Sequence, residues 1–290
     1  MQQKIFAAAA GRNIADILFI DSSWIPGFLK EEMLEPVADA KAKAWLSAVS
    51  PEIKELSDYG NGRMWGYVQY GIDVYGLTWN KDHFREAGLD PERPPRTWDE
   101  LREYSKKLVK RDAQGNITRV GYAIRHVGHP HGIVHKHFWA LVGGGMQLVD
   151  DPNRLRGGKA VINTEGGRAA LQLVLDMLNV DKSTSLNFPD PRAAFLKGIA
   201  SMQISETVSI RARQPKEAPD LQWGMALPPA PRAGAKPVTL LGGWLYSVPK
   251  QAKNKAEAWQ AIEWINSADK DYELCKKYNA SPRYQANWEK

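Results

Sequence analysis

Hydrophobic and polar positions along the chain alternate between short apolar runs and amphipathic segments. The apolar runs have the length of buried strands and lie at residues 17–20, 121–124, 199–204, 223–227 and 240–248. Between them, apolar residues recur at helical spacing after Thr164 and again after Lys255. Strands that alternate with amphipathic helices predict the α/β fold class, with largely parallel sheets.

Two helix boundaries are marked by the residues beside them. Thr97 and Glu100 form a capping box, in which a hydroxyl and a carboxylate can accept hydrogen bonds from backbone N–H groups. The helix that begins there is expected to run to about Lys110. Gly11 follows an apolar segment at 5–10 and predicts the end of an N-terminal helix ahead of the first strand.

Proline punctuates the second half of the chain. The run Ala226–Pro231 contains three prolines, so it cannot continue a helix or a central strand. We predict that this stiff, extended run crosses between two lobes. A second crossing is predicted near residues 71–74, where a tyrosine-rich apolar segment passes between glycine-flanked strands.

Composition bounds the class of protein. The chain has 290 residues, of which 43% are hydrophobic and 25% charged, which suits one large globular domain or two of middling size. Its apolar stretches are too short and too rich in glycine to span a bilayer. The single cysteine, Cys275, excludes an internal disulfide and any site built from several cysteines.

The charged residues bear on partners and targeting. Lys and Arg number 39 against 33 Asp and Glu, a net charge of +6, but bases and acids are interspersed, as at residues 99–103. We therefore expect no nucleic-acid partner, because no basic stripe could follow a phosphate backbone. Lys4 and the alanines after it are similar to a secretion signal, but Arg12 and Asp16 interrupt the apolar run, so no signal peptide is predicted.

Motifs that mark common enzymes are absent from the sequence. There is no P-loop, dinucleotide glycine fingerprint, nucleophile elbow or metalloprotease helix. The sequence is instead rich in aromatic residues, with 11 tryptophans and 10 tyrosines, many of them beside a glycine or a turn.

Several motifs together carry a resemblance to a known family. The strings GRMWG at 62–66, TWNKD at 78–82, AGL at 87–89 and PPRTWDEL at 94–101 follow one another in a characteristic order and spacing. They are similar to extracellular solute-binding protein family 1, the solute-binding proteins of sugar ABC transporters. Later strings that resemble the family are FLKGIASM at 195–202, GGWLYSVPK at 242–250 and SPR at 281–283.

The resemblance implies a type II periplasmic-binding-protein fold, with two α/β lobes and a ligand cleft between them. Residues 1–72 and 232–282 would form lobe 1, residues 73–231 lobe 2, and residues 283–290 the start of a return crossing. Relative to the family pattern, we expect that the opening strand–helix–strand unit and the last C-terminal helices are missing.

The resemblance also implies a function. The chain would capture a carbohydrate, or a related polyol or glycerol phosphate, and deliver it to the membrane subunits of an ABC permease. It would act as a monomer in the periplasm or at the cell surface, meeting the membrane only through the permease. No reaction and no cofactor are expected.

Positions that match the family's ligand loops supply the candidate site, because sugars need aromatic faces beside hydrogen-bonding groups. The candidates are Ser22, Ser23, Trp24, Tyr70, Asp73, Tyr75, Trp139, Glu206, Arg211, Gly243, Trp244 and Arg283.

Each candidate also has a structural alternative. Ser23 could cap the next helix while Trp24 packs at its base. Trp244 follows two glycines that permit close backbone approach and is the best stacking candidate, but it could equally be a buried strand tryptophan. Asp73 could be a solvated edge acid, and Arg211 a solvated helix residue.

The histidines offer a function of another class. Five of the six lie between residues 126 and 137, and His129, His131 and His135 have a spacing that could hold Zn²⁺ or Cu²⁺. A metal-binding protein or metal-dependent enzyme is therefore the alternative hypothesis. It is weakened because no acidic general base accompanies the cluster and because glycines and a proline interrupt the segment.

Overall fold

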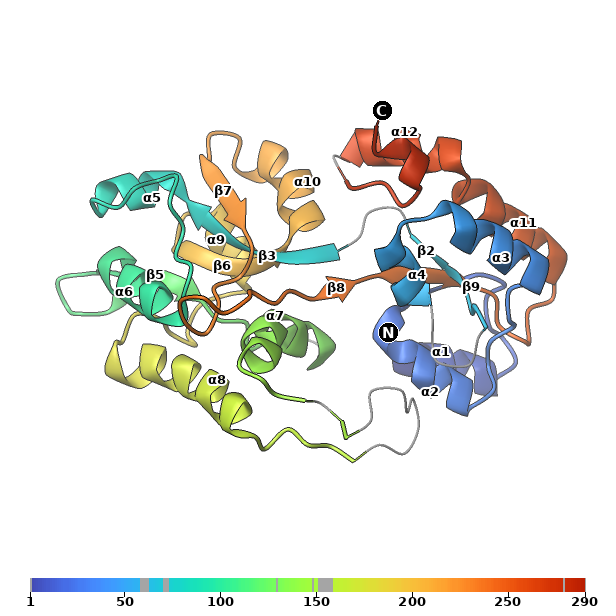
Figure 1. Cartoon of the computed structure of the whole chain (residues 1–290), viewed down its shortest axis with the longest axis horizontal. Helices are drawn as coiled ribbons and strands as arrows, with labels where there is room; N and C mark the ends of the chain where they lie inside the picture. The colour runs from blue at the N-terminus through green and yellow to red at the C-terminus, as the bar shows by residue number, and fades with distance from the viewer. Residues whose placement is uncertain are drawn as a thin grey trace. The chain divides into compact units, whose positions relative to one another are not determined.

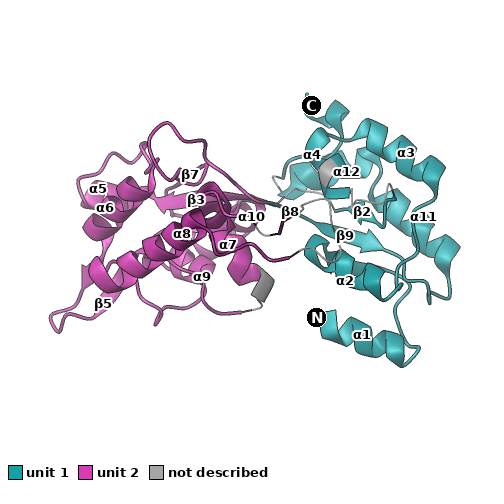
Figure 2. Ribbon diagram, turned by 60° about the horizontal axis from the view of Figure 1, so that its bottom comes forward, with its two compact units in different colours: residues 1–73, 151–158, 241–290 teal, residues 74–150, 159–240 magenta. Residues whose placement is uncertain are grey.

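The computed structural model describes residues 2–57, 63–69, 73–128, 130–147, 149–150, 159–278 and 280–289. The chain divides into two compact units (Figure 2). Unit 1 contains residues 1–73, 151–158 and 241–290, and unit 2 contains residues 74–150 and 159–240. No helix among the described residues combines the length and the apolar character that crossing a membrane requires.

Unit 1 is built on a three-stranded sheet with the order β1-β9-β2, in which both ladders are antiparallel. The strands of this sheet are β1 (Leu18–Asp21), β2 (Tyr67–Val68) and β9 (Trp244–Ser247). Unit 1 also includes the residues of β8 (Leu241–Gly242), which is not part of this sheet. Its helices are α1 (Gln2–Ala10), η1 (Ser22–Trp24), α2 (Ile25–Lys30), α3 (Asp39–Ala48), α4 (Pro51–Ser57), α11 (Lys255–Ile265), α12 (Ala268–Tyr278) and η3 (Gln285–Asn287) (Figure 1).

Unit 2 is built on a sheet with the order β4-β5-β6-β3-β7, and β8 also pairs with β3. Its strands are β3 (Asp73–Asn80), β4 (Lys110–Arg111), β5 (Ile117–Ala123), β6 (Ala200–Glu206) and β7 (Trp223–Ala226). Its helices are α5 (Lys81–Glu86), α6 (Trp98–Leu108), α7 (Pro130–Gly143), α8 (Glu165–Leu175), the π-helix η2 (Asp176–Val180), α9 (Pro191–Leu196) and α10 (Thr207–Glu217).

The prediction of largely parallel sheets is wrong. Of the β1–β9, β2–β9, β3–β6, β3–β7, β4–β5 and β5–β6 ladders, only β5–β6 is parallel. Successive strands β6 and β7, joined by α10, do run in the same direction, but β3 lies between them and runs the opposite way. Alternating strands and helices predict the direction of successive strands, and they do not reveal which distant strand inserts between them.

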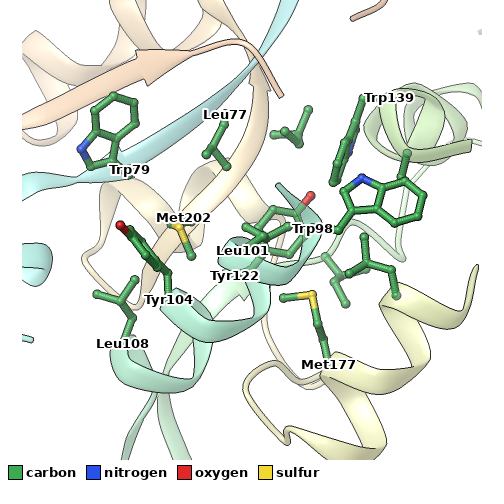
Figure 3. Packing of buried hydrophobic residues seen from close by; sticks show 14 of the residues in the cluster. Leu77, Trp79, Trp98, Leu101, Tyr104, Leu108, Tyr122, Trp139, Met177 and Met202 are labelled. Atoms are coloured by element: carbon green, nitrogen blue, oxygen red, sulfur yellow. The ribbon is translucent and has the colours of Figure 1, made fainter. Parts of the chain in front are cut away.

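The larger buried hydrophobic cluster of unit 2 lies on one face of this sheet (Figure 3), and a smaller one contains Val120, Ala123, Ala194 and Ala200. Opposed residues of the β3–β6 ladder share a face, so Leu77 and Trp79 of β3 join Ile204 and Met202 of β6. Helices α6, α7 and α8 contribute the residues that cover this face. These include Trp98, Leu101, Trp139, Leu173 and, from η2, Met177.

Local sequence signals are confirmed at the start of α6. Thr97 Oγ1 accepts a hydrogen bond from Glu100 N at 3.2 Å. The Glu100 carboxylate accepts from Arg96 N at 2.7 Å, one residue before the position that the capping box predicts. The helix ends at Leu108, two residues before the expected end.

The proline run does not cross between the units. Ala230 N donates to Arg96 O at 2.9 Å, and Trp98 N donates to Ala230 O at 3.0 Å, so residues 226–231 are tied within unit 2. Residues 232–240, predicted in lobe 1, also group with unit 2, where Tyr75 N donates to Leu240 O. Residues 283–290, predicted to begin a return crossing, group with unit 1.

Candidate functional site

Five of the candidate residues meet in unit 1, where β1 ends beside the start of β9. Ser22, Ser23 and Trp24 form η1 directly after β1. Gly243 and Trp244 reach the same place, because Asp21 opposes Trp244 in the ladder and Ser22 N donates to Gly243 O at 3.0 Å. The antiparallel register of two short strands therefore brings together residues that are about 220 positions apart in the sequence.

The serines of this cluster are organised by a carboxylate that we had not singled out in the sequence. Asp21 is 5% exposed, and its Oδ1 accepts from Ser23 N at 2.9 Å and from Ser23 Oγ at 2.5 Å. Asp21 is therefore the N-cap of η1. The next helix, α2, has no side-chain cap, so the prediction that Ser23 caps it is wrong, whereas Trp24 is buried as that alternative expected. Ser23 is exposed and Ser22 half-buried, so two hydroxyls stand at the end of the strand.

Three aromatic rings line the same position, and we call Phe19, Trp24 and Trp244 the aromatic corner. Phe19 and Trp244 are stacked, with ring centroids 5.0 Å apart and planes 19° apart. Trp24 meets Trp244 edge-on at 5.5 Å. Trp24 is 6% exposed and acts as the base of the corner, whereas Phe19 is 39% exposed and Trp244 half-buried. Partly exposed, preformed ring faces of this kind can stack on the C–H faces of a sugar.

In unit 2, Tyr75 of β3 and Glu206 of β6 oppose each other in the ladder. Tyr75 is 4% exposed, and its hydroxyl lies 3.2 Å from Nδ1 of His135 in α7. Glu206 occupies the last position of β6, immediately before α10. Two candidates from strands that are about 130 residues apart are therefore neighbours.

Lys136 completes this group, although no sequence pattern pointed to it. Its Nζ lies 2.7 Å from Glu206 Oε2 and 4.8 Å from the centroid of the Tyr75 ring. The Lys136 side chain is 3% exposed and that of Glu206 12% exposed. The pair joins α7 to the end of β6, so its geometry depends on tertiary structure alone.

The electrostatics of the pair follow from burial and contact. Burial opposes ionisation of Glu206, but the charge and hydrogen bond of Lys136, together with Arg192, outweigh it and lower the pKa of Glu206 to about 2. Burial lowers the pKa of Lys136 to about 8, although Glu206 acts in the opposite direction. Both groups are consequently charged at neutral pH, and the carboxylate is a permanent hydrogen-bond acceptor.

Three candidates belong to the cores of their units, and one of them is Tyr75, which lies in the same buried cluster as Trp139. Trp139 is 4% exposed, packs edge-on against Trp98 at 6.4 Å, and donates from Nε1 to Lys136 O (Figure 3). Arg283 is fully buried in unit 1, where it pairs with Asp271 and donates to Val68 O. These contacts give the side chains of Trp139 and Arg283 a packing role. The sequence motifs alone could not show whether these residues pack in the core or contact a ligand.

The remaining candidates are placed less completely. Arg211 is exposed on α10. Asp73 is the first residue of β3, but its side chain is not among those that the structure describes. Tyr70 lies outside the described residues.

The histidine segment shows separate roles for the side chains that are described. His135 Nδ1 faces the Tyr75 hydroxyl, and His137 Nε2 lies 3.0 Å from Arg125 O. His129 and the side chain of His131 fall outside the described part of the chain. Within that part, no three His, Cys, Asp or Glu residues are grouped so that they could hold a metal ion.

Comparison with known proteins identifies relatives over most of the chain. A "probable ABC transporter-binding protein" of Deinococcus radiodurans is 24% identical over 276 residues, which are 92% of this chain and 61% of that protein. An sn-glycerol-3-phosphate-binding periplasmic protein of Shigella flexneri is 62% identical over a shorter stretch of 121 residues, 40% of this chain and 26% of that protein. The chain thus spans only about 60% of the length of the curated relatives that match most of it.

The fold has close counterparts among solved structures. Maltose-bound MalE3 of T. maritima superimposes with a TM-score of 0.80 at 25% identity, covering 100% of this chain and 71% of that one. Such neighbours are two-lobed periplasmic binding proteins, which confirms the predicted fold class. Residues 1–271 match the family described as bacterial extracellular solute-binding protein, and the chain therefore belongs to that family.

Proposed function

We propose that this chain is the solute-binding component of an ABC importer, which captures a carbohydrate, or a related polyol or glycerol phosphate, and delivers it to the permease. The family match over residues 1–271 carries the proposal. The maltose bound to the T. maritima structure supports a sugar, and the name of the Shigella relative supports a glycerol phosphate. Both are small solutes with several hydroxyl groups. The proposed location is the periplasm or the cell surface.

Each unit by itself offers residues with suitable binding chemistry. In unit 1, Trp244 offers a ring face, and Ser22 and Ser23 offer hydroxyls at the end of β1. In unit 2, Glu206 offers a charged acceptor beside the Tyr75 ring. Aromatic faces beside charged and hydroxyl groups match the alternating C–H and O–H surfaces of a sugar.

We further propose that the chain binds its solute without converting it and acts as a monomer. The family and fold are those of solute-binding proteins, which supports a binding role. Affinity would come from contacts that are already in place before the solute arrives, as the capped η1 and the stacked rings are.

A thermal-shift screen followed by calorimetry tests the proposal. The probes are maltose, mannobiose, sn-glycerol 3-phosphate and glycerophosphocholine, with Zn²⁺ and EDTA as separate arms. A solute that binds only the folded state must raise the melting temperature, by an amount that grows with its concentration. We expect one of the four to do so, unchanged by EDTA, and to be recovered chemically intact. A shift with Zn²⁺ alone, or conversion of the solute, would contradict the proposal.

A further inference from the structure

The most unusual buried group outside the predicted set is the Lys136 ammonium. Its side chain is 3% exposed, and removing an ammonium from water costs several kcal/mol unless good partners compensate. Lys136 has two partners of different kinds: the carboxylate of Glu206 at 2.7 Å and the ring of Tyr75 at 4.8 Å. Both partners are candidates for contact with the solute, and a ladder of paired strands holds them side by side.

We propose that Lys136 is a positioning residue for solute binding: it holds the Glu206 carboxylate and the Tyr75 ring in one arrangement at the end of β6. The inference rests on the proposed function, in which Glu206 and Tyr75 contact the solute. A carboxylate offers about four acceptor positions. Lys136 Nζ occupies one on Oε2, and Ser205 Oγ approaches the same oxygen at 3.4 Å. An anchored carboxylate can therefore accept from a solute hydroxyl while it remains bonded to Lys136.

The other charged groups near Glu206 are mainly engaged with one another. Arg192 of α9 lies 4.0 Å from Glu206 Oε2, but it is closer to Asp190 Oδ1, at 3.3 Å. Arg125, which follows β5, lies 4.0 Å from Asp190 Oδ2. Lys136 is thus the one base in hydrogen-bond contact with Glu206 among these described groups. From α7, His135 faces Tyr75 rather than Glu206.

Removing the charge of Lys136 should therefore change how binding depends on pH. In Lys136→Met the carboxylate stays largely buried, while a backbone hydrogen bond and the more distant Arg192 still oppose the effect of burial. The pKa of Glu206 should then rise from its lowered value toward the pH range over which binding is measured. The wild-type carboxylate stays charged throughout that range, so it adds no pH dependence of its own.

The test measures affinity by calorimetry at pH 5, 6, 7 and 8 for the wild type, Lys136→Met and the double variant Lys136→Met/Glu206→Gln. The probes are maltose and sn-glycerol 3-phosphate. We expect Lys136→Met to bind at least tenfold more weakly at pH 7, with a further loss of about tenfold on going to pH 5. The double variant should bind weakly, and between pH 5 and 7 it should show the pH dependence of the wild type; the comparison stops there because wild-type Lys136 loses its own charge near pH 8. Because the double variant retains His135, it separates titration of Glu206 from titration of that histidine.

Two results would overturn the inference: wild-type affinity in Lys136→Met at every pH, or an affinity loss of equal size at every pH. The second would assign Lys136 a structural role alone. Should Lys136→Met fail to fold, Lys136→Arg and the double variant decide. If Lys136 is a positioning residue, Lys136→Arg should bind within threefold of the wild-type affinity, and the double variant should lose at least tenfold. Wild-type affinity in the double variant would overturn the inference.

Failure of the proposed function would look different. If neither probe binds the wild type at any pH, the proposal that the chain captures these solutes is contradicted. The proposed positioning role of Lys136 is then contradicted as well, because it depends on solute binding. If the wild type binds and the Lys136 variants bind equally well, only the inference about Lys136 fails.

Discussion

Arg283 and Asp271 form a fully buried ion pair in unit 1: Arg283 Nε lies 2.7 Å from Asp271 Oδ1, and both side chains are 0% exposed. The carboxylate also accepts from Arg283 N at 3.1 Å and from Asn287 Nδ2 at 3.2 Å. The guanidinium in turn donates to Val68 O on β2. The pair therefore ties the segment after α12 both to that helix and to an edge strand of the sheet.

Removing one partner of this pair should destabilise unit 1 strongly. Asp271→Asn leaves a buried guanidinium without its counter-charge, which typically costs about 3–5 kcal/mol. Urea unfolding monitored by fluorescence would measure the loss. The matched control is Arg85→Met, which breaks an ion pair whose side chains are 52% and 57% exposed and should cost less than about 1 kcal/mol. Equal losses in the two variants would contradict the structural role of Arg283.

Trp244→Ala should weaken solute binding by at least about 1 kcal/mol, roughly a fivefold loss of affinity, because aromatic anchors dominate binding energy. Calorimetry with the probe that binds the wild type would measure it. Trp264→Ala is the control, since Trp264 is 64% exposed on α11 of the same unit and outside the aromatic corner. Unchanged affinity in Trp244→Ala would remove the aromatic corner from the site.

Two glycines should respond in opposite ways to alanine. A Cβ at Gly121 of β5 would collide with the backbone carbonyl of Ser105 in α6, so Gly121→Ala should destabilise by about 1–3 kcal/mol. At Gly27, inside α2, the nearest atom is Gln2 Nε2 at 3.5 Å, an ordinary contact. Gly27→Ala should stabilise by roughly 0.5–1 kcal/mol, because glycine is a poor helix residue. Thermal unfolding would compare them, and a stable Gly121→Ala variant would argue against close packing of α6 on β5.

His83 should make the protein sensitive to acid. Burial, and then the charge of Arg119, lower the pKa of His83 from 6.5 to about 4, and its Nδ1 lies 3.0 Å from Ser201 Oγ. Between pH 4 and 6.5 the unfolded chain binds more protons than the folded one at this residue, so stability falls as the pH falls through that window.

The variant His83→Gln removes this titration and retains a polar side chain beside Ser201. Its melting temperature should fall less than that of the wild type between pH 7 and pH 4.5. A series of thermal melts across this range would show the difference. Parallel curves for the two proteins would mean that folding does not lower the pKa of His83.

Local features of this fold could be predicted because they depend on residues a few positions apart. The hydroxyl of Thr97 caps α6 from three residues away, and Thr164 does the same for α8 through Gly167 N. Strand positions followed from short apolar runs for the same reason. Strand direction could not be predicted, because it depends on β3 inserting between two strands that come more than a hundred residues later.

The candidate site residues also include some features that the sequence predicted and others that it could not predict. Ser22 and Trp244 were predicted from motifs, and the β1–β9 register brings them together. Trp139 and Arg283 carry motif positions too, but their burial could not be read from a motif, since an aromatic or a basic residue occurs in both cores and binding sites. Lys136 was missed, because its partner Glu206 lies 70 residues away.

By itself, the sequence determined the family, the two-lobed α/β fold class and the starts of α6, α8 and α11, because motifs, apolar periodicity and caps are all local patterns. Only the tertiary structure decided that β3 runs against its neighbours, that the proline run stays within unit 2, and that Asp21 rather than Ser23 caps η1. It also decided which charges are paired in the interior. Those outcomes depend on desolvation and on contacts between residues that are distant in the sequence. The free energy of burying a charge depends on the groups that surround it, and these groups come together only in the folded structure.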